Sequence, residues 1–416
     1  MNDARRLHRA APRRRRPWRR YVASLGVLVL LALIVGAVQL LRPLPEVVAR
    51  RVELPRPQLG PGRTVLPAVP GAEITVALDG VGTLASSTRQ AEVPIASVAK
   101  VMSALVVLAD HPLRGGETGP SIRITAADVA TYERESAAQD SVVAVRAGEQ
   151  MSERTALEAA LVPSADNVVQ LLATWDAGSR SAFVARMNAE ARRLGLVHTH
   201  YAGPSGVDPA TVSTAADQVR LATIALENPV LASIVSKPQV TLPVAGVQYN
   251  VDADLGHDGI VGVKTGWVPQ GGASFVFAAR RRVGALRTTV VGAIVGDQAV
   301  PALPTVLAAA RRVVRAADDA LVVERAVASG ERVGSLYSGY GSPVPVVTAG
   351  TATLLGWRGA HPVESMAIAA RLHVPIAAGT RVGTLTVSLG SERRTVTLVT
   401  AGHLGSPSLS WRLTRG

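Results

Sequence analysis

The sequence contains no cysteine among its 416 residues and very few aromatic side chains. Without cysteine, a disulfide framework, a cysteine nucleophile and a cysteine-ligated metal are all excluded. Aromatic residues make up 3% of the chain, whereas hydrophobic residues as a whole make up 48%, so the core must consist mainly of Val, Leu, Ala and Ile. A chain of this length is long enough for two or three domains.

Lysine is almost as scarce as the aromatics. Only three of the 44 basic residues are lysine, at positions 100, 237 and 264. Arginine cannot give up its proton in a protein, whereas lysine can. A lysine retained in such a chain therefore indicates a position that needs proton transfer or a compact cation. Lys100 and Lys264 lie in short polar motifs, whereas Lys237 has no such context and is expected at the surface.

The net charge of +13 is concentrated at the N-terminus. Residues 1–20 carry nine arginines and one aspartate, which leaves only +5 for the rest of the chain. The segment that follows, from Tyr21 to Leu41, carries no charge and is long enough to cross a bilayer as a helix. We therefore expect a basic cytoplasmic tail over 1–20 and a single transmembrane helix over 21–42, in the cell membrane, with the remainder of the chain outside the cell.

A cleaved signal peptide is the alternative to this anchor. Its apolar region is typically about 7–15 residues long and ends in a small-residue cleavage site. No clear A-x-A motif follows the apolar run here, so we favour an uncleaved anchor. Because the basic excess is largely a tail and not a binding face, we expect no nucleic-acid partner.

The remaining chain divides by composition. Residues 43–69 are rich in proline and lack an apolar period, which indicates a semi-extended linker. Residues 70–318 begin with a strand pattern, continue with helices and end with three β runs and a helix; the first helix covers Val98–Ala109, with Ser97 at its cap position. This order predicts an α/β (α+β) domain with an antiparallel sheet and a helical insert.

The C-terminal part of the chain, from residue 319 onward, is rich in Val, Thr and Gly and poor in helix signals. Two segments within it, Gly330–Leu336 and Gly379–Leu385, resemble each other. Two copies are too few for a solenoid. We therefore expect residues 319–416 to form a small all-β domain with two similar hairpin units.

Two motifs carry the chemistry. Ser97-Val98-Ala99-Lys100 places a hydroxyl and an amine one helical turn apart on the same face, so that the lysine can act as the base that a serine nucleophile needs. Lys264-Thr265-Gly266 ends a β run, where a lysine and a hydroxyl can bind a carboxylate of the substrate. The glycine would let the substrate backbone lie close to that strand.

A third element, Ser164-Ala165-Asp166-Asn167, lies between these two in the sequence. The order of the three resembles that of penicillin-binding proteins and serine β-lactamases. The surrounding segments resemble the low-molecular-weight D-alanyl-D-alanine carboxypeptidases, namely PIASVAKVMSALVVL, MNAEARRLGLVHTHYAGPSGV and STAADQVRLA. The resemblance covers about residues 70–318, and the β tail is similar to that family's C-terminal domain more weakly.

The resemblance implies catalytic roles for three residues. Ser97 would be the acylated nucleophile, Lys100 its general base, and Ser164 a proton relay to the leaving amine. The implied reaction removes the terminal D-Ala from peptidoglycan stem peptides through an acyl-enzyme, with β-lactams as inhibitors. Neither a metal nor another cofactor is expected.

The resemblance also implies a substrate-binding group. Lys264 would supply positive charge, Thr265 would hold the terminal carboxylate, and Gly266 would let the substrate approach the strand. The backbone N–H groups of Ser97 and Trp267 would form the oxyanion hole.

The middle motif departs from the family's S-x-N pattern. Asp166 stands where the family has Asn, and the amide comes one residue later, at Asn167. Either residue could serve substrate binding, and we hypothesise that Asp166 is the one in the site. A carboxylate beside Lys100 would favour its protonated form, which opposes its use as a base.

Other functions remain open. A catalytically degenerate scaffold that binds wall fragments, a D,D-endopeptidase and a transpeptidase would all fit the same motifs. A class A β-lactamase needs an E-x-x-x-N loop for the deacylating water. Glu190 and Glu227 are the only glutamates between the second and third motifs, and Leu194 and Leu231 stand four positions after them, so rapid β-lactam hydrolysis is not expected.

Overall fold

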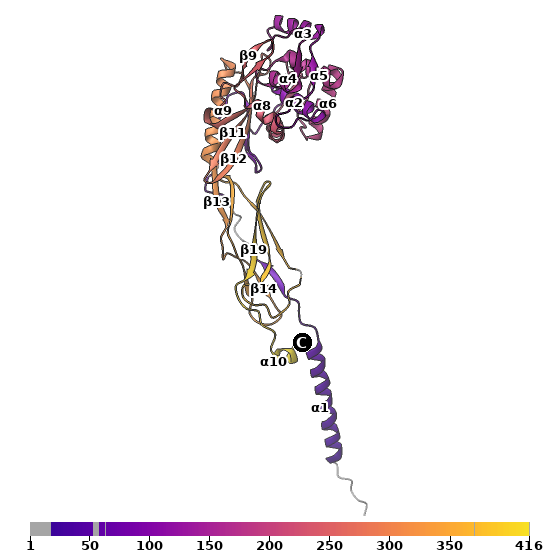
Figure 1. Cartoon of the computed structure of the whole chain (residues 1–416). Helices are drawn as coiled ribbons and strands as arrows, with labels where there is room; N and C mark the ends of the chain where they lie inside the picture. Colours follow the sequence, from indigo (N-terminus) through magenta and orange to yellow (C-terminus); the bar gives the residue numbers. More distant parts are fainter. Residues whose placement is uncertain (1–17, 53–57, 63, 370, 416) are drawn as a thin grey trace, which may run out of the picture.

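The computed structural model describes residues 18–52, 58–62, 64–369 and 371–415. The molecule is elongated (Figure 1). A mixed helix-and-sheet part lies at one end, a β part lies in the middle, and helix α1 (Trp18–Leu41) lies at the other end. Most of the expected basic tail, residues 1–17, lies outside the described residues.

A five-stranded antiparallel sheet forms the centre of the mixed part, with strand order β10-β11-β12-β2-β3. Alternate residues of its middle strands face two different cores, as the two-residue period of a strand requires. In β11, Phe275 and Phe277 pack on one side, and Val276 and Ala278 pack on the other. The strands are β2 (Glu73–Leu78), β3 (Gly82–Ser86), β10 (Ile260–Val268), β11 (Gly272–Val283) and β12 (Leu286–Asp297).

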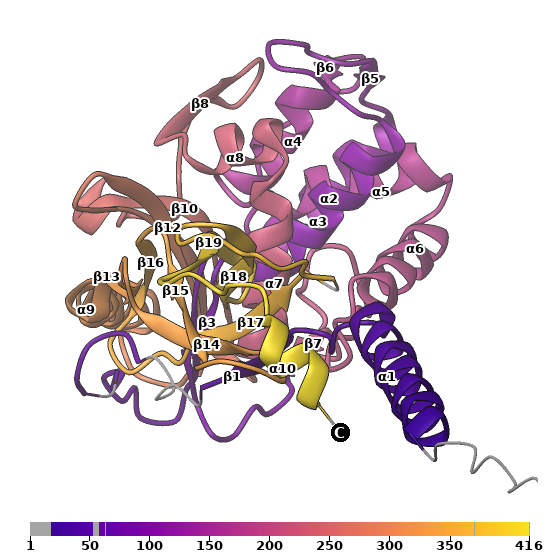
Figure 2. The same cartoon turned by 90° about the horizontal axis from the view of Figure 1, so that it is seen from below.

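Helices cover both faces of this sheet. Helix α9 (Ala302–Ala320) packs its Val and Ala face against the phenylalanine side. The helical insert covers the opposite face, which is visible from below in Figure 2. The expected mixture of helices with an antiparallel sheet is therefore confirmed. The insert contains α2 (Lys100–Asp110), α3 (Ala126–Ala137), α4 (Glu153–Leu161), α5 (Asp166–Ala177), α6 (Arg180–Arg193), α7 (Ala215–Leu226), α8 (Pro229–Val235) and the 3-10 turn η1 (Ala96–Ala99).

Short strand pairs and one further turn complete the mixed part. They connect the helices, and Ile122, Met151, Val240 and Leu242 from these strands are part of the core on the insert side of the sheet. They are β4 (Val93–Pro94) with β7 (Val212–Ser213), β5 (Ser121–Arg123) with β6 (Gln150–Ser152), β8 (Gln239–Leu242) with β9 (Gly246–Tyr249), and the 3-10 turn η2 (His257–Gly259).

The β part is built on a six-stranded antiparallel sheet with order β1-β14-β15-β19-β18-β17, together with a separate β13-β16 pair. Aliphatic residues such as Val333, Leu336, Leu385 and Leu398 form its core. The short helix α10 (Leu409–Thr414) follows the last strand. The strands are β1 (Val48–Arg51), β13 (Leu321–Val327), β14 (Arg332–Tyr337), β15 (Val344–Thr348), β16 (Ala352–Trp357), β17 (Val363–Ile368), β18 (Arg381–Leu389) and β19 (Glu392–Thr400).

The two similar segments of the β part have the same local structure. Gly330 and Gly379 both have a positive φ, of 78° and 79°. Their N–H groups donate to the carbonyl oxygens of Thr348 and Thr400, at 2.8 and 2.7 Å. A register shift follows each turn, at Arg332 in β14 and Arg381 in β18. The sequence similarity therefore corresponds to two equivalent turns that start equivalent strands.

Parts of the segment over residues 43–69, which we expected to be a linker, are packed against the β part. Residues 48–51 form strand β1, which pairs with β14. Leu59 is 1% exposed within the core of the β part, and its backbone exchanges hydrogen bonds with Ala360 and Gly359, at 2.9 and 2.7 Å. The sequence does not predict these contacts, because the partner residues come about 300 residues later in the chain, after all three motifs.

Helix α1 starts at Trp18 and ends at Leu41, close to the expected range of 21–42. Among the described residues it alone is long and apolar enough to cross a membrane, and none of its residues is buried. The C-terminus of the chain contacts its last turn. The guanidinium of Arg415 donates to the carbonyl oxygens of Gln39 and Pro43, at 2.9 and 3.0 Å. Cations are favourable at the C-terminal end of a helix, because the carbonyl groups there lack partners.

Replacing the buried Leu59 by alanine should weaken the β part. Leu59→Ala leaves a cavity, and such changes cost about 2–5 kcal/mol. We expect a lower urea midpoint in circular dichroism, whereas Val65→Ala, at a side chain 76% exposed, should leave the midpoint unchanged. Equal effects of the two substitutions would contradict the attachment of the linker to this core.

Candidate active site

Ser97 and Lys100 face each other at the start of the helical insert. Ser97 lies within the 3-10 turn η1, and Lys100 is the first residue of α2. Lys100 Nζ donates to Ser97 Oγ at 2.7 Å, so the i,i+3 spacing brings the two groups together as expected. The expected helix cap at Ser97 is wrong, because Ile95 precedes η1 and no side chain caps either helix. The serine hydroxyl is engaged by the lysine instead.

Lys100 is buried, with 1% of its surface exposed, and the Ser164–Asn167 motif supplies its other polar contacts. Lys100 Nζ donates to Ser164 Oγ at 2.9 Å and to the Ser164 carbonyl oxygen at 2.8 Å. Asp166 Oδ1 lies 2.7 Å from the same nitrogen. Three hydrogen bonds use the three protons of an ammonium group, so the contact with Asp166 is chiefly electrostatic.

Asn167 points away from this group. Its Oδ1 accepts from the N–H of Val143 at 3.1 Å, and its Nδ2 donates to the carbonyl oxygen of Val143 at 3.0 Å. The backbone N–H of Asp166 donates to the carbonyl oxygen of Ser141 at 2.7 Å. The start of α5 therefore holds the 141–143 segment with Asn167 and presents Asp166 to Lys100.

The Lys264-Thr265-Gly266 motif lies in strand β10, which runs close to Ser97. Lys264 and Thr265 are each 2% exposed, whereas Trp267 is 52% exposed. A Cβ at Gly266 would lie 2.9 Å from the backbone nitrogen of Ser97 and 2.7 Å from the carbonyl oxygen of Ile95. Glycine is therefore required for β10 to approach η1, a reason that differs from the approach of substrate expected from the sequence.

Lys264 is a buried cation beside another one. Burial, and after it the charge of Lys100, lowers the pKa of Lys264 to about 7. Its Nζ donates to the carbonyl oxygen of Thr265 at 3.0 Å. The protonation of this lysine is therefore sensitive to nearby charges at neutral pH.

The backbone of Gly206 packs closely against the turn that contains Ser97. Ala96 has a φ of +51°, a conformation that is unusual for a residue other than glycine. Gly206, with a φ of +83°, packs so closely that a Cβ there would lie 1.9 Å from the Ala96 carbonyl oxygen. Nearby, Ser103 Oγ donates to the Pro204 carbonyl oxygen at 2.6 Å. The 204–206 segment thus holds the turn that presents Ser97.

Two acidic residues near the site were missed in the sequence. Burial raises the pKa of Glu135 to about 7, with further contributions from Asp166 and Asp140. Burial and Asp166 also raise the pKa of Asp140. Glu135 lies on α3, and the packing of α3 against α5 brings it near Asp166, so no local sequence pattern marks it.

The histidines show no sign of a metal centre. His198 Nδ1 lies 3.1 Å from Glu92 Oε1, and His200 forms a bridge with Val212. In the described part of the chain, no three His, Cys, Asp or Glu residues are grouped so that they could hold a metal ion.

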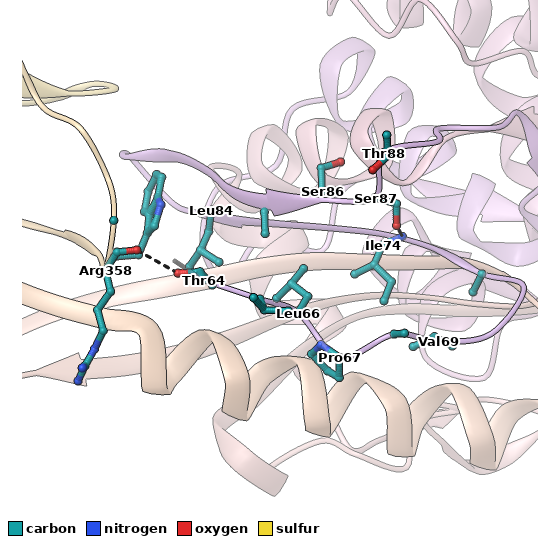
Figure 3. A pocket seen from close by; sticks show the side chains of 16 residues that line it. Thr64, Leu66, Pro67, Val69, Ile74, Leu84, Ser86, Ser87, Thr88 and Arg358 are labelled. Carbon is teal, nitrogen blue, oxygen red and sulfur yellow. Dashed lines mark hydrogen bonds between the residues drawn. The ribbon is translucent and has the colours of Figure 1, made fainter. Parts of the chain in front are cut away.

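A separate hollow of about 700 Å³ lies where the mixed part meets the β part (Figure 3). Thr64 Oγ1 donates to the Arg358 carbonyl oxygen at 3.3 Å on one side of it, and Ser87 Oγ accepts from the Ile74 N–H at 2.8 Å on the other. No residue of the three motifs lines this hollow. It is therefore distinct from the group around Lys100.

The two serines on either side of the buried Lys100, between a helical insert and the edge strand of an antiparallel sheet, define a serine acyl-transfer enzyme of the penicillin-binding class. The family described as D-alanyl-D-alanine carboxypeptidase matches residues 71–294, which is more than half of the sequence. The chain belongs to this family, whose members are serine-type carboxypeptidases related to the low-molecular-weight penicillin-binding proteins.

Curated relatives carry two kinds of name. The chain is 33% identical over 228 residues to D-alanyl-D-alanine carboxypeptidase DacB2 of Mycobacterium tuberculosis, covering 53% of this chain and 74% of that protein. It is 35% identical over 160 residues to a D-alanyl-D-alanine endopeptidase of Pseudomonas aeruginosa, covering 38% of this chain and 48% of that one. The chain thus spans about half the length of the latter relative.

Solved structures extend the likeness beyond the catalytic part. Penicillin binding protein 5 from Haemophilus influenzae has a TM-score of 0.59 at 18% identity, covering 82% of this chain and 99% of that one. The D-alanyl-D-alanine carboxypeptidase DacD from Francisella tularensis also has a TM-score of 0.59, at 17% identity, covering 83% and 96%. At these identities the likeness concerns the fold alone.

The contacts of Asp166 and Asn167 predict opposite effects of alanine. Asp166→Ala removes a charged contact to Lys100, and contacts of that kind are worth about 1.5–3 kcal/mol. We expect acylation by a fluorescent penicillin to slow by about 10- to 150-fold. Asn167→Ala should instead lower the stability by about 1–3 kcal/mol, because it leaves the Val143 backbone unpaired, while the folded protein reacts within a few-fold of wild type.

Acylation rates and thermal denaturation of both variants measure this difference. Unchanged acylation in Asp166→Ala together with abolished acylation in folded Asn167→Ala would reverse the assignment of the two residues.

Proposed function

We propose that this chain is a serine D,D-carboxypeptidase that removes the terminal D-Ala of peptidoglycan stem peptides. The observation that carries the proposal is the position of Lys100 Nζ, which lies within hydrogen-bond distance of both Ser97 Oγ and Ser164 Oγ. A single amine can therefore take a proton from the nucleophile and exchange one with a second hydroxyl. The family of the chain provides the substrate class.

In the proposed reaction, Lys100 acts from its neutral amine form: its lone pair accepts the hydroxyl proton of Ser97, which gives the ammonium, while Oγ attacks the carbonyl carbon of the penultimate D-Ala. The C–N bond to the terminal D-Ala then breaks, and the proton passes from Lys100 through Ser164 to the leaving amine. Free D-Ala departs and leaves an ester on Ser97. Water hydrolyses this ester, which releases the shortened peptide and restores the serine.

The substrate would lie along β10. Lys264 and Thr265 supply a cation and a hydroxyl for the terminal carboxylate. The approach of β10 to η1 supports the proposed oxyanion hole, because a Cβ at Gly266 would lie 2.9 Å from the backbone nitrogen of Ser97 and Trp267 is the next residue of the strand. Donors fixed in this way can stabilise the negative charge that develops on the carbonyl oxygen.

β-Lactams should acylate Ser97 and stay attached, because the glutamate loop that promotes deacylation in class A β-lactamases is absent from the sequence. The alternative activity at the same site is that of an endopeptidase. It is supported by the similarity to the relative from Pseudomonas aeruginosa, which is named D-alanyl-D-alanine endopeptidase. A scaffold without turnover is the other alternative, and the departure of Asp166 from the S-x-N pattern of the family favours its consideration.

We also propose the placement of this enzyme at the membrane and its division into domains. Helix α1 would anchor it, with residues 1–20 in the cytoplasm, a linker over 43–69, a catalytic domain over 70–318 and a β domain over 319–416. The direct passage from α9, which ends at Ala320, into β13, which begins at Leu321, supports the last boundary.

The first test is the mass of the intact protein after incubation with penicillin. We expect wild type to gain one penicillin mass, and Ser97→Ala to gain none because it lacks the attacking oxygen. Release of D-Ala from a stem pentapeptide then separates a carboxypeptidase from an endopeptidase, which would cleave only cross-linked peptides. Absence of an adduct on folded wild type would favour the scaffold without turnover.

The absence of cysteine allows a direct test of orientation. Thr351→Cys, at an exposed position of the β part, should react in intact cells with a maleimide that cannot cross the membrane. Asn2→Cys should react only after permeabilisation, because arginine-rich flanks stay in the cytoplasm. Labelling of Asn2→Cys in intact cells would exclude the proposed orientation.

A further inference from the structure

The β11–β12 hairpin carries four arginines close to its turn. Three of them end β11 and one lies at the start of β12. They line a surface hollow of about 600 Å³ together with one aspartate and two threonines. With a single acidic residue in this lining, the hollow carries a net positive charge. The lining residues are Asp79, Arg280, Arg281, Arg282, Arg287, Thr288 and Thr289.

The strand register places three of these arginines on one face of the hairpin. Arg282 lies directly opposite Arg287, and Arg280 lies opposite Thr289. Side chains two positions apart on a strand, or directly opposite across a pair, share a face. On that face, Ala278 packs in the insert-side core, whereas Arg280 and Arg282 are exposed. The arginines therefore continue this face of the sheet where the helical insert no longer covers it.

One of the four arginines has a carboxylate partner in the described part of the chain. Arg281 Nε lies 3.4 Å from Asp318 Oδ1 in α9. No carboxylate oxygen of a described residue lies within 4 Å of the guanidinium nitrogens of Arg280, Arg282 or Arg287. Three exposed cations therefore face one hollow without a counter-charge in contact with them.

The pairing of Arg282 with Arg287 is unfavourable for the fold. Like charges directly opposite each other across an antiparallel pair are destabilising. The two-residue turn Gly284–Ala285, in which Gly284 has a φ of +60°, fixes this register. Arg282 Nε also donates to the Gly284 carbonyl oxygen at 3.1 Å, so the turn itself orients one guanidinium. A local conflict that no core packing offsets indicates a binding function.

The hollow is remote from the nucleophile. At the far end of β11, Ala273 pairs with Trp267, next to the glycine that approaches η1. A strand rises about 3.3 Å per residue, so Arg282 lies roughly 30 Å further along the sheet. The contact of Arg281 with the last turns of α9, just before β13, places the hairpin at the end of the sheet that faces the β part. The β part lies between this end and α1 (Figure 1).

We propose that this hollow binds a polymer of phosphate groups through Arg280, Arg282 and Arg287. A phosphate has several anionic oxygens and can accept from two guanidinium forks at once. A chain of such groups matches three arginines on one face. Because the β part separates the hollow from α1, the ligand is a polymer outside the membrane and not a lipid headgroup. Binding there would hold the catalytic part beside an anionic polymer independently of the reaction at Ser97.

The absence of cysteine allows a probe that reports on this hollow alone. A fluorophore on Ala285→Cys, in the exposed turn of the hairpin, responds to binding nearby and not to binding at the arginine-rich N-terminus. Inorganic polyphosphate is titrated into the full chain in neutral detergent at low salt, because salt screens exposed charges. We expect a saturable change in fluorescence. Half-saturation should need about tenfold more polyphosphate in Arg282→Gln/Arg287→Gln, since each exposed charge contact contributes a few-fold.

Arg123→Gln/Arg192→Gln is the matched control. It removes two positive charges from exposed positions elsewhere in the mixed part and should leave half-saturation unchanged. Equal losses in both double variants would show that net charge alone attracts the polymer, and no saturable change in wild type would exclude the site. An equal response to poly-glutamate would contradict the preference for phosphate. An equal response to glycerol phosphate at the same phosphate concentration would contradict the need for a chain.

Thermal denaturation without ligand separates a binding role from a structural one. Arg287→Gln removes the repulsion opposite Arg282, so we expect Tm to rise by about 1–4 °C at low salt while half-saturation moves to higher polyphosphate. A lower Tm in this variant would mean that Arg287 stabilises the hairpin, and would overturn its assignment to a ligand.

Discussion

The Lys100 ammonium and the oxygens around it are the constraint on which the rest of the site depends. Four oxygens from two chain segments, η1 and residues 164–166, lie within 2.9 Å of one buried nitrogen. If any segment moved by about 1 Å, it would lose its hydrogen bond, because such bonds weaken steeply beyond their normal range. The first turn of α2, the Ser164 turn and the start of α5 must therefore be placed together.

Much of the surrounding fold serves this placement. The Ser164 turn adopts a φ of +67°, and Ala96 before the nucleophile a φ of +51°, so both serines are presented from strained backbone. Gly206 and Gly266 press against η1 from two sides at distances that a side chain would block. The cores on either face of the sheet hold β10 and α2 in position while Ser97 itself stays partly exposed.

The sequence predicted the local chemistry better than the long-range contacts. Ser97 and Lys100 could be paired because helical spacing alone brings i and i+3 together. The scarcity of lysine drew attention to Lys264 without any knowledge of the fold. The preference for Asp166 over Asn167 could be stated only as a hypothesis, since it depends on whether the amide side chain finds the Val143 backbone.

The features that were missed all depend on partners far away in the sequence. Strand β1 comes before the catalytic part in the chain, whereas its pairing partner β14 comes after it. Glu135 comes near Asp166 only when α3 packs against α5. The obstruction at Gly266 comes from the backbone of Ile95 and Ser97, on the other side of the helical insert in the sequence. Spacing patterns carry no information about such contacts, because these arise only when distant segments pack together.

The attachment of the linker to the β part has a mechanical consequence. When α1 is held in a membrane and Ser97 is bound to the wall, tension between the two first loads the β1–β14 hydrogen bonds and the buried Leu59. The segment from 43 to 69 could span roughly 90 Å if fully extended. Strand β1 and Leu59 keep part of this length packed against the β part as a reserve. An enzyme anchored as proposed would therefore lengthen only after the load had separated β1 from β14.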